Sequence, residues 1–284
     1  MPVRPSAVAA AYARLASVFP GLAVTELEAG QEPPTGTGWI RADELAAGGD
    51  ALDAFLAWDD AQVLRDYGQR ARPDVVASFG LHRYAWPACL LITVPWFLHR
   101  RVPRYPATHV SFDRAAAGLA VGRMAVRPAG FACLPGDPAA TLPGARVVPD
   151  GEALRAEVRA AVAEHLEPVL AAFGPRMRRR GRALWGMATD EVVEGLWYIA
   201  QLLGESEERR AIHELELLLP GSTRPYAGAA AFRELTGPKG EPLRTRDRVS
   251  CCMFYTLRPE DACATCPRTC GSDRVAKVAA VAAC

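Results

Sequence analysis

The chain has 284 residues, 50% of them hydrophobic and 23% charged, a composition typical of a globular protein with one large domain or two modest ones. Its formal net charge of +1 at pH 7 excludes a protein that binds nucleic acid or another polyanion through bulk charge. The GxGxxG, P-loop, HExxH and GxSxG patterns are absent, so the sequence indicates no nucleotide site of its own and no zincin or serine hydrolase.

The first 30 residues are expected to form an amphipathic helix and its exit, because their apolar side chains fall near helical spacing. Arg14 interrupts the apolar core that a secretion signal needs. The most apolar run, residues 85–98, is too short for a membrane span and contains Pro87 and Pro95. These features predict a cytoplasmic protein without a membrane span, in which thiols stay reduced.

The rest of the N-terminal half reads as helices followed by strands. Residues 31–39 are a loop rich in proline and glycine, and residues 43–68 are helical with a break at Gly48-Gly49. Residues 74–101 are apolar on every side, which favours a buried helix kinked by its prolines, with a helix followed by a strand as the second choice. Residues 103–149 carry short apolar runs separated by glycine, proline and charge, typical of a small antiparallel sheet.

From residue 150 the pattern becomes helical. Asp150 is expected to cap a helix that stops at Gly174-Pro175, and further helices are expected over about residues 189–204 and 206–220. His165 lies close to the apolar face of the first of these helices, where a core histidine is more common than a ligand. Two isolated cysteines in apolar surroundings are expected to be inert buried thiols, namely Cys89 and Cys133.

These elements predict an α+β fold that is rich in helix, with a small antiparallel sheet and a C-terminal metal-binding segment at about residues 244–270. The expected division is an N-terminal α+β subdomain over residues 1–149 and a helical subdomain over residues 150–284, which includes that segment.

The strongest local charge is a set of five arginines within residues 176–182. Such a stretch is either a solvated connection or an anion-recognition loop, because guanidinium groups bind carboxylates and phosphates in bidentate fashion. Arg178, Arg179 and Arg180 are therefore candidate substrate-binding residues, with docking of an acidic electron carrier as another use. Nucleic acid is a poorer fit, since the patch is short and lacks interleaved aromatic residues.

Cysteines gather near the C-terminus. Cys251 and Cys252 are adjacent, ten residues separate them from a CxxC pair formed by Cys263 and Cys266, and Cys270 follows four residues later. Thiolates select zinc, Cu(I) or iron–sulfur clusters. Adjacent side chains on extended backbone point to opposite faces, so Cys251 and Cys252 share a single metal ion only if the chain turns sharply. A centre with two irons is larger, so it relaxes this condition. A four-cysteine zinc site and a disulfide knot are the alternatives, the second being disfavoured in a reducing compartment.

The CC-x10-CxxC pattern, preceded by Arg244, Arg246 and Arg248, resembles the FhuF-like ferric-siderophore reductase family. Residues 82–86 (HRYAW) and 184–186 (LWG) also look similar to that family. The resemblance implies a [2Fe–2S] cluster, and its ligand positions fall on four residues of this sequence: Cys251, Cys252, Cys263 and Cys266. Cys270 has no place in the pattern, and both it and Cys284 are expected to be free thiols.

The resemblance further implies an oxidoreductase that transfers one electron to siderophore-bound Fe(III) and releases Fe(II) in the cytoplasm, with no catalytic residue beyond the cluster. Ferric siderophores of the hydroxamate type are the favoured substrates. Because the chain lacks a nucleotide motif, its electrons are expected from an external donor such as a ferredoxin or a reduced flavin. A non-enzymatic zinc protein that serves an interaction, or an iron–sulfur electron carrier without a substrate, are the alternatives.

Four residues beside the cysteines have expected supporting roles. Positive charge favours the reduced, more negative cluster, so Arg248 and Arg258 are expected to raise its potential. Phe254 and Tyr255 are expected to pack against the cluster and exclude water.

Overall fold

The longest apolar stretch of the sequence forms the central helix of the molecule, α4 (Pro73–His99). The computed structural model describes residues 6–28, 30–116, 118, 120–221, 223–260, 263–269 and 271–282, with the side chains of the last two left out. Helix α4 contains both Pro87 and Pro95. Proline cannot donate to the carbonyl four residues earlier, and the Tyr12 hydroxyl donates to the Leu91 carbonyl at 2.8 Å instead.

By length and composition, α4 is the one helix among the described residues that is apolar enough to cross a membrane. However, 78% of its most apolar window is buried inside the protein. Helices α5 (Gly151–Met177) and α6 (Gly181–Leu203) pack along it. The apolar character of α4 is therefore that of a core helix, as the sequence predicted.

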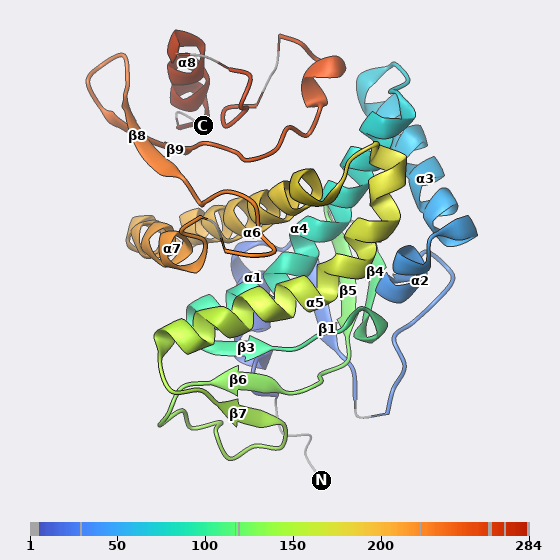
Figure 1. Cartoon of the computed structure of the whole chain (residues 1–284), viewed down its shortest axis with the longest axis vertical. Helices are drawn as coiled ribbons and strands as arrows, with labels where there is room; N and C mark the ends of the chain where they lie inside the picture. Colours follow the sequence, from blue (N-terminus) through green and yellow to red (C-terminus); the bar gives the residue numbers. More distant parts are fainter. Residues whose placement is uncertain are drawn as a thin grey trace.

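The remaining described helices surround this centre (Figure 1). They are α1 (Ala9–Val18), α2 (Ala42–Ala47), α3 (Gly49–Tyr67), α7 (Glu205–Leu218) and α8 (Gly271–Ala282), with 3-10 turns at Ala107–His109 (η1) and Phe254–Thr256 (η2). The expected break at Gly48-Gly49 separates α2 from α3. Asp150 caps α5 as expected, because its carboxylate accepts a hydrogen bond from the Ala153 N–H at 2.8 Å.

Two expected helix boundaries were wrong. Helix α5 continues through Gly174-Pro175 to Met177, and it ends where Arg178 adopts the left-handed conformation. Helix α6 begins at Gly181, eight residues before the expected start. The sequence did not predict helix over residues 181–188, because glycine, arginine and tryptophan interrupt the regular apolar spacing there.

The described strands form three small sheets, two of which contain a parallel pair. The first has the order β1-β5-β4-β2, from β1 (Leu22–Glu26), β5 (Gly122–Val126), β4 (Val110–Asp113) and β2 (Ile40–Arg41). The second has the order β3-β6-β7, from β3 (Arg101–Pro103), β6 (Phe131–Cys133) and β7 (Ala145–Val147). The third pairs β8 (Phe232–Thr236) with β9 (Pro242–Arg246) in antiparallel fashion. The α+β class is confirmed. The antiparallel sheet expected over residues 103–149 is instead divided between the first two sheets, each of which contains a parallel pair, and β8 and β9 form a sheet of their own.

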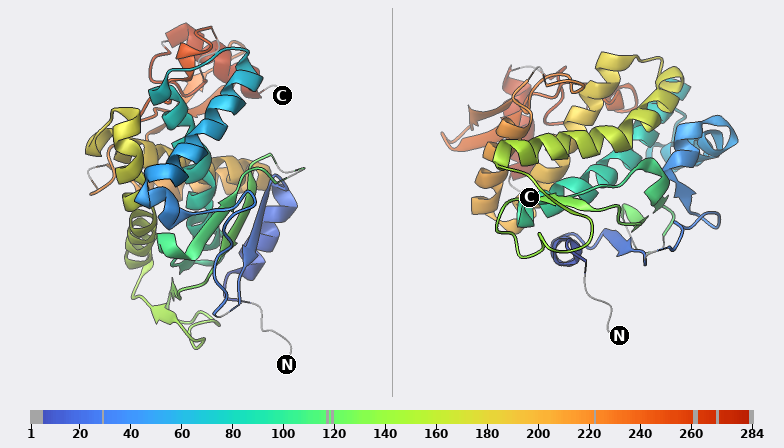
Figure 2. Two further views of the ribbon diagram at one scale, coloured as in Figure 1. Left: turned by 90° about the vertical axis from the view of Figure 1, so that its right-hand side faces the viewer. Right: turned by 60° about the horizontal axis from the view of Figure 1, so that its bottom comes forward.

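One large core joins the two halves of the chain, since it includes Leu81 and Phe97 of α4 together with Val162 of α5 and Leu196 of α6. The division at residue 149 remains a prediction. Cys89 and Cys133 are buried, and burial raises the pKa of both thiols. The C-terminal segment after β9 lies at one end of the molecule, and the β3-β6-β7 sheet lies at the other (Figures 1 and 2).

Candidate metal centre

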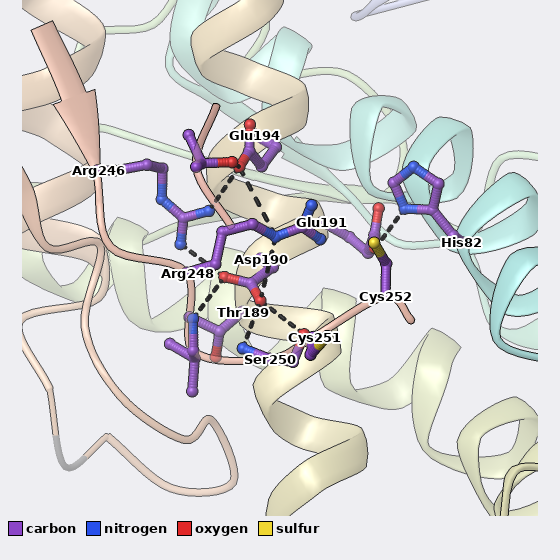
Figure 3. Close-up of polar contacts among 12 residues, drawn as sticks. His82, Thr189, Asp190, Glu191, Glu194, Arg246, Arg248, Ser250, Cys251 and Cys252 are labelled. Atoms are coloured by element: carbon purple, nitrogen blue, oxygen red, sulfur yellow. Dashed lines mark hydrogen bonds and ion pairs between the residues drawn. The ribbon is translucent and has the colours of Figure 1, made fainter. Parts of the chain in front are cut away.

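A buried carboxylate on α6 positions the residues that lead into the cysteine pair. Asp190 is fully buried, and it accepts hydrogen bonds from the Arg246 guanidinium at 2.7 Å and from the Val249 N–H at 3.0 Å. It also accepts from the Ser250 N–H at 2.8 Å and from the Ser250 hydroxyl at 2.6 Å (Figure 3). Four hydrogen bonds to one carboxylate fix residues 246–250 against α6, directly before Cys251.

Residues 246–250, the lead segment before the cysteine pair, pass very close to two glycines. A Cβ atom on Gly186 of α6 would lie 3.1 Å from Val249 Cγ1, and one on Gly228 would lie 2.5 Å from Val249 Cγ2. Gly228 also has φ +78, which glycine adopts without strain. Val249 is thus held between two close backbone positions, and at Gly228 a side chain would clash with it.

The chain turns sharply directly after the adjacent cysteines, as a shared site requires. Met253 has φ 65 and ψ 10, the left-handed conformation. The turn directs the Met253 N–H to Cys251 Sγ at 3.4 Å, and the Phe254 N–H donates to the Cys252 sulfur. Two consecutive backbone donors therefore point at the two neighbouring sulfurs, and N–H donors to ligand sulfurs help to set the potential of iron–sulfur centres.

The CxxC pair contacts the adjacent cysteine pair through Cys263, its first cysteine. Cys263 and Cys252 share a hydrogen bond between their side chains. The Cys266 N–H donates to the Cys263 carbonyl at 3.0 Å, which closes the CxxC turn. Inside that turn the Thr265 hydroxyl donates to Glu194 of α6 at 3.0 Å. The Cys266 side chain is buried, and α8 holds its carbonyl through Arg274 at 2.8 Å.

The acidities of the thiols reflect these contacts. The hydrogen bond with Cys263, together with the Phe254 N–H and the charge of Arg248, lowers the pKa of Cys252. The same hydrogen bond raises the pKa of Cys263, and burial raises the pKa of Cys251. No three histidine, cysteine or acidic side chains among the described residues are grouped closely enough to hold a single metal ion. The ligand assignment therefore depends on the chemistry of the donor set.

The positive charge of Arg248 lowers the pKa of both Cys252 and Cys263. Its side chain is only 9% exposed, and its Nε lies 3.7 Å from the Asp190 carboxylate and 3.8 Å from that of Glu194. Arg258, the other arginine expected to act on the cluster, has its guanidinium 5.9 Å from the Tyr67 ring centre. The contacts of these residues thus support a direct electrostatic role for Arg248.

His82 and Glu191 form a second polar pair beside Cys252 (Figure 3). The imidazole Nδ1 lies 2.6 Å from Glu191 Oε1, and Glu191 is 1% exposed. Burial lowers the pKa of His82, but the Glu191 carboxylate more than offsets this, so the pKa of His82 is raised. His82 belongs to the HRYAW fragment, and Gly186 to the LWG fragment, so both fragments of the family resemblance lie beside the cysteine segment.

Apolar side chains shield the turn that follows the cysteine pair. Met253 and Leu257 are buried against α3 and α4, in a cluster that also contains Phe79. The Phe254 ring packs against Tyr67 at 5.7 Å and against Phe79 at 6.3 Å between ring centres. Tyr255 differs from its neighbour, because its ring is half-exposed beneath the guanidinium of Arg268 at 4.1 Å.

The arginine loop touches the cysteine segment at one point. Arg179 donates to the Cys251 carbonyl at 2.8 Å. Arg178 and Arg180 are exposed, and together with Arg179 they line a shallow pocket next to the end of α5. Arg179 is therefore a support for the backbone at Cys251, and a substrate role for these three arginines remains a prediction.

A larger cavity of about 720 Å³ opens next to the CxxC pair. Its lining includes Cys263, Arg248 and His82 together with Phe19, directly after α1, and aromatic residues of α3, α4 and α6. Sequence reasoning missed this cavity and the acidic residues of α6. One available signal was the spacing of Asp190 and Glu194, four residues apart in an apolar helix, which implies buried partners such as the alternating arginines before Cys251.

The cysteine segment has a counterpart among known protein families. Residues 248–268 match the family model described as the FhuF 2Fe-2S C-terminal domain, and this stretch includes Cys251, Cys252, Cys263 and Cys266. The match covers a short region of the chain. No curated protein matches the chain. The resemblance seen in the sequence is confirmed for this segment.

Proposed function

We propose that the protein is a ferric-siderophore reductase whose [2Fe–2S] cluster is held by Cys251, Cys252, Cys263 and Cys266. The observation that carries this proposal is the family match over residues 248–268, which contains all four cysteines. The local contacts are consistent with it, because backbone N–H groups donate to two of the sulfurs and a buried arginine lies beside them. Four thiolates complete such a cluster, which supplies one electron at a time when bound.

One electron suffices for the reaction. Ferric iron binds the hard oxygens of siderophores tightly, whereas ferrous iron carries less charge, binds them more weakly and is released. The electron passes from an external donor, such as a ferredoxin or a reduced flavin, to the iron, and no bond forms between protein and substrate. The protein acts in the cytoplasm in this proposal, where such donors are present.

The chain's own residues hold, shield and tune the site. Asp190 fixes the segment before the cysteines, and the apolar cluster around Phe79 and Met253 excludes water from one side. Arg248 places a positive charge beside Cys252 and Cys263, which favours the electron-rich state. No side chain needs to act as a general acid or base for the electron transfer itself.

Anaerobic turnover tests this function. A reduced donor is mixed with ferric siderophores and catalytic amounts of protein, and Fe(II) is trapped by a coloured ferrous chelator. We expect rapid Fe(II) formation with the wild-type protein and only the background rate with Cys252→Ser, while Cys89→Ser, a change at a buried cysteine outside the site, retains the rate. Equal rates with and without protein would contradict the proposal.

A further inference from the structure

The cavity beside the CxxC pair has the size of a small-molecule site. Its volume of about 720 Å³ falls within the range of about 300–1,000 Å³ that such sites have. Of the four cysteines assigned to the cluster, Cys263 is the one that lines it. A ligand bound there would lie next to one end of the electron path, so the cavity has the position that a reducible substrate needs.

The charges that face the cavity are mostly positive. Arg83, Arg114 and Arg248 line it together with His82, and Glu194 is the acidic residue among the described lining side chains. The balancing carboxylates lie behind this surface, because three acidic residues that pair with these cations are at most 1% exposed: Asp59, Asp190 and Glu191. The cavity therefore presents cations to a ligand and keeps their counter-charges in the protein interior.

The arginines of the lining differ in how firmly they are held. Arg248 is more than nine-tenths buried, and its Nε faces the Asp190 and Glu194 carboxylates at 3.7 Å and 3.8 Å, so it contributes positive charge rather than a free donor. Arg83 is 32% exposed and is held by longer ion pairs, at 3.3 Å to Asp59 and 3.8 Å to Asp66. Arg83 is therefore the arginine of the lining that can turn toward an anionic ligand.

Aromatic rings supply the other part of the lining. Phe19, Trp86 and Tyr198 pack edge to face, with ring centres 5.6–6.0 Å apart. Tyr198 lines the cavity and is 43% exposed, so part of its side chain is open to a ligand. Trp58 also faces the cavity, under the guanidinium of Arg114 at 4.0 Å. Such a surface favours a ligand with flat, electron-rich rings, which stack on aromatic residues and on guanidinium groups.

We propose that this cavity binds the ferric substrate and selects an anionic chelate that carries aryl rings, as in the tris-catecholate class. This inference rests on the proposed function. Each catecholate arm brings two oxygen charges to the iron, so its complex is anionic, whereas a tris-hydroxamate complex of Fe(III) has no such excess. The cavity thus favours a different class from the hydroxamates expected from the sequence, and it replaces the arginine loop at Arg178, Arg179 and Arg180 as the binding surface.

Calorimetric titration with gallium(III) complexes tests binding apart from reduction, because Ga(III) is not reduced by biological donors. The protein with its cluster is titrated with a gallium tris-catecholate and with a gallium tris-hydroxamate. We expect the catecholate complex to bind at least about tenfold more tightly, a difference of about 1.4 kcal/mol. Equal or tighter binding of the hydroxamate complex would overturn the assignment of the ligand class.

Single substitutions test the location. Arg83→Gln leaves Asp59 paired with Arg114 and is expected to weaken catecholate binding about tenfold. The matched control is Arg180→Gln, which removes an exposed arginine of the loop and should leave the affinity unchanged. If Arg180→Gln weakened catecholate binding and Arg83→Gln did not, the arginine loop would be the binding surface instead of the cavity. If Arg83→Gln failed to fold, Tyr198→Leu at the exposed aromatic surface would test the same location. We expect this substitution to weaken catecholate binding several-fold.

Reduction assays with the same variants separate this inference from the proposed function. If the gallium complex binds in the cavity but ferric complexes are not reduced, the cavity assignment stands and the reductase proposal fails. If Arg83→Gln and Tyr198→Leu both reduce a ferric catecholate with wild-type KM, the reductase proposal stands and the cavity assignment fails.

Discussion

Single residues around the cysteines have separable tasks. Asp190 orders the backbone, since it accepts two main-chain and two side-chain hydrogen bonds. Arg246 is fully buried and satisfied by Asp190, Glu194 and the Ala230 carbonyl, so its role is structural. Arg248 is buried but incompletely paired, and it lies beside the thiols. Because its charge acts on Cys252 and Cys263, Arg248 is the arginine expected to act on the cluster.

We expect Arg248→Gln to lower the reduction potential, because the substitution removes a positive charge that favours the reduced state. An interaction of about 1.4 kcal/mol corresponds to about 59 mV for a one-electron couple, so the shift should be roughly 60 mV. Redox titration followed by EPR measures it. Arg258→Gln is the matched control, since Arg258 lies over Tyr67, and its shift should be much smaller. Equal shifts in the two variants would argue against a specific role for Arg248.

At the scale of elements, α6 is the support of the site. It carries Asp190, Glu191 and Glu194 on one side, and Gly186 allows the lead segment to approach its backbone. The sequence predicted most helices because their periodicity is local, whereas it left the sharp turn after the cysteine pair open as one condition for a shared site. It did not predict the parallel pairing of β1 with β5, because a hundred residues separate Leu22 from its partner Gly122 and no local pattern records that contact.

The close approach at Val249 gives a test of this support. Gly228→Ala places a Cβ 2.5 Å from Val249 Cγ2 and also carries the cost of a positive φ. Gly136→Ala, at φ +82 with nothing within 4 Å of the added Cβ, has nearly the same positive φ and lacks the clash. We expect Gly228→Ala to lower the free energy of unfolding by about 1–3 kcal/mol more than Gly136→Ala, as measured by chemical denaturation.

A second substitution checks the cause. Val249→Ala combined with Gly228→Ala removes the two methyl groups in the clash, so the double variant should recover most of the excess loss and retain its iron. If the double variant were as unstable as Gly228→Ala alone, contact with Val249 would not be the reason for the glycine.

At the scale of the whole molecule, the core includes a buried, hydrogen-bonded histidine, as the sequence predicted. His165 is 1% exposed, with Nδ1 2.8 Å from the Tyr105 carbonyl and Nε2 2.7 Å from the Tyr84 hydroxyl. Burial lowers its pKa to about 4. The cavity, in contrast, was not predictable, because its lining combines side chains from positions as distant as Phe19 and Thr265, and only the complete fold brings them together.

His165 should make the stability depend on pH. Its folded-state pKa lies below the unfolded value of about 6.5, so the unfolded chain binds a proton first, and stability falls as the pH drops from about 6.5 toward 4. The contribution of this residue amounts to about 3 kcal/mol over that interval. Urea denaturation near pH 7 and near pH 4.5 should show a smaller loss of stability for His165→Gln than for the wild type. Parallel losses would mean that His165 is not held neutral.

The cluster itself is tested by the visible absorption and EPR spectra of the anaerobically purified protein before and after dithionite, with iron, sulfide and zinc counted. We expect a red-brown protein with two irons and two sulfides per chain, and a rhombic EPR signal that appears on reduction. A colourless protein that holds one zinc would contradict this expectation, and would leave Cys251, Cys252, Cys263 and Cys266 as the ligands of a structural zinc site.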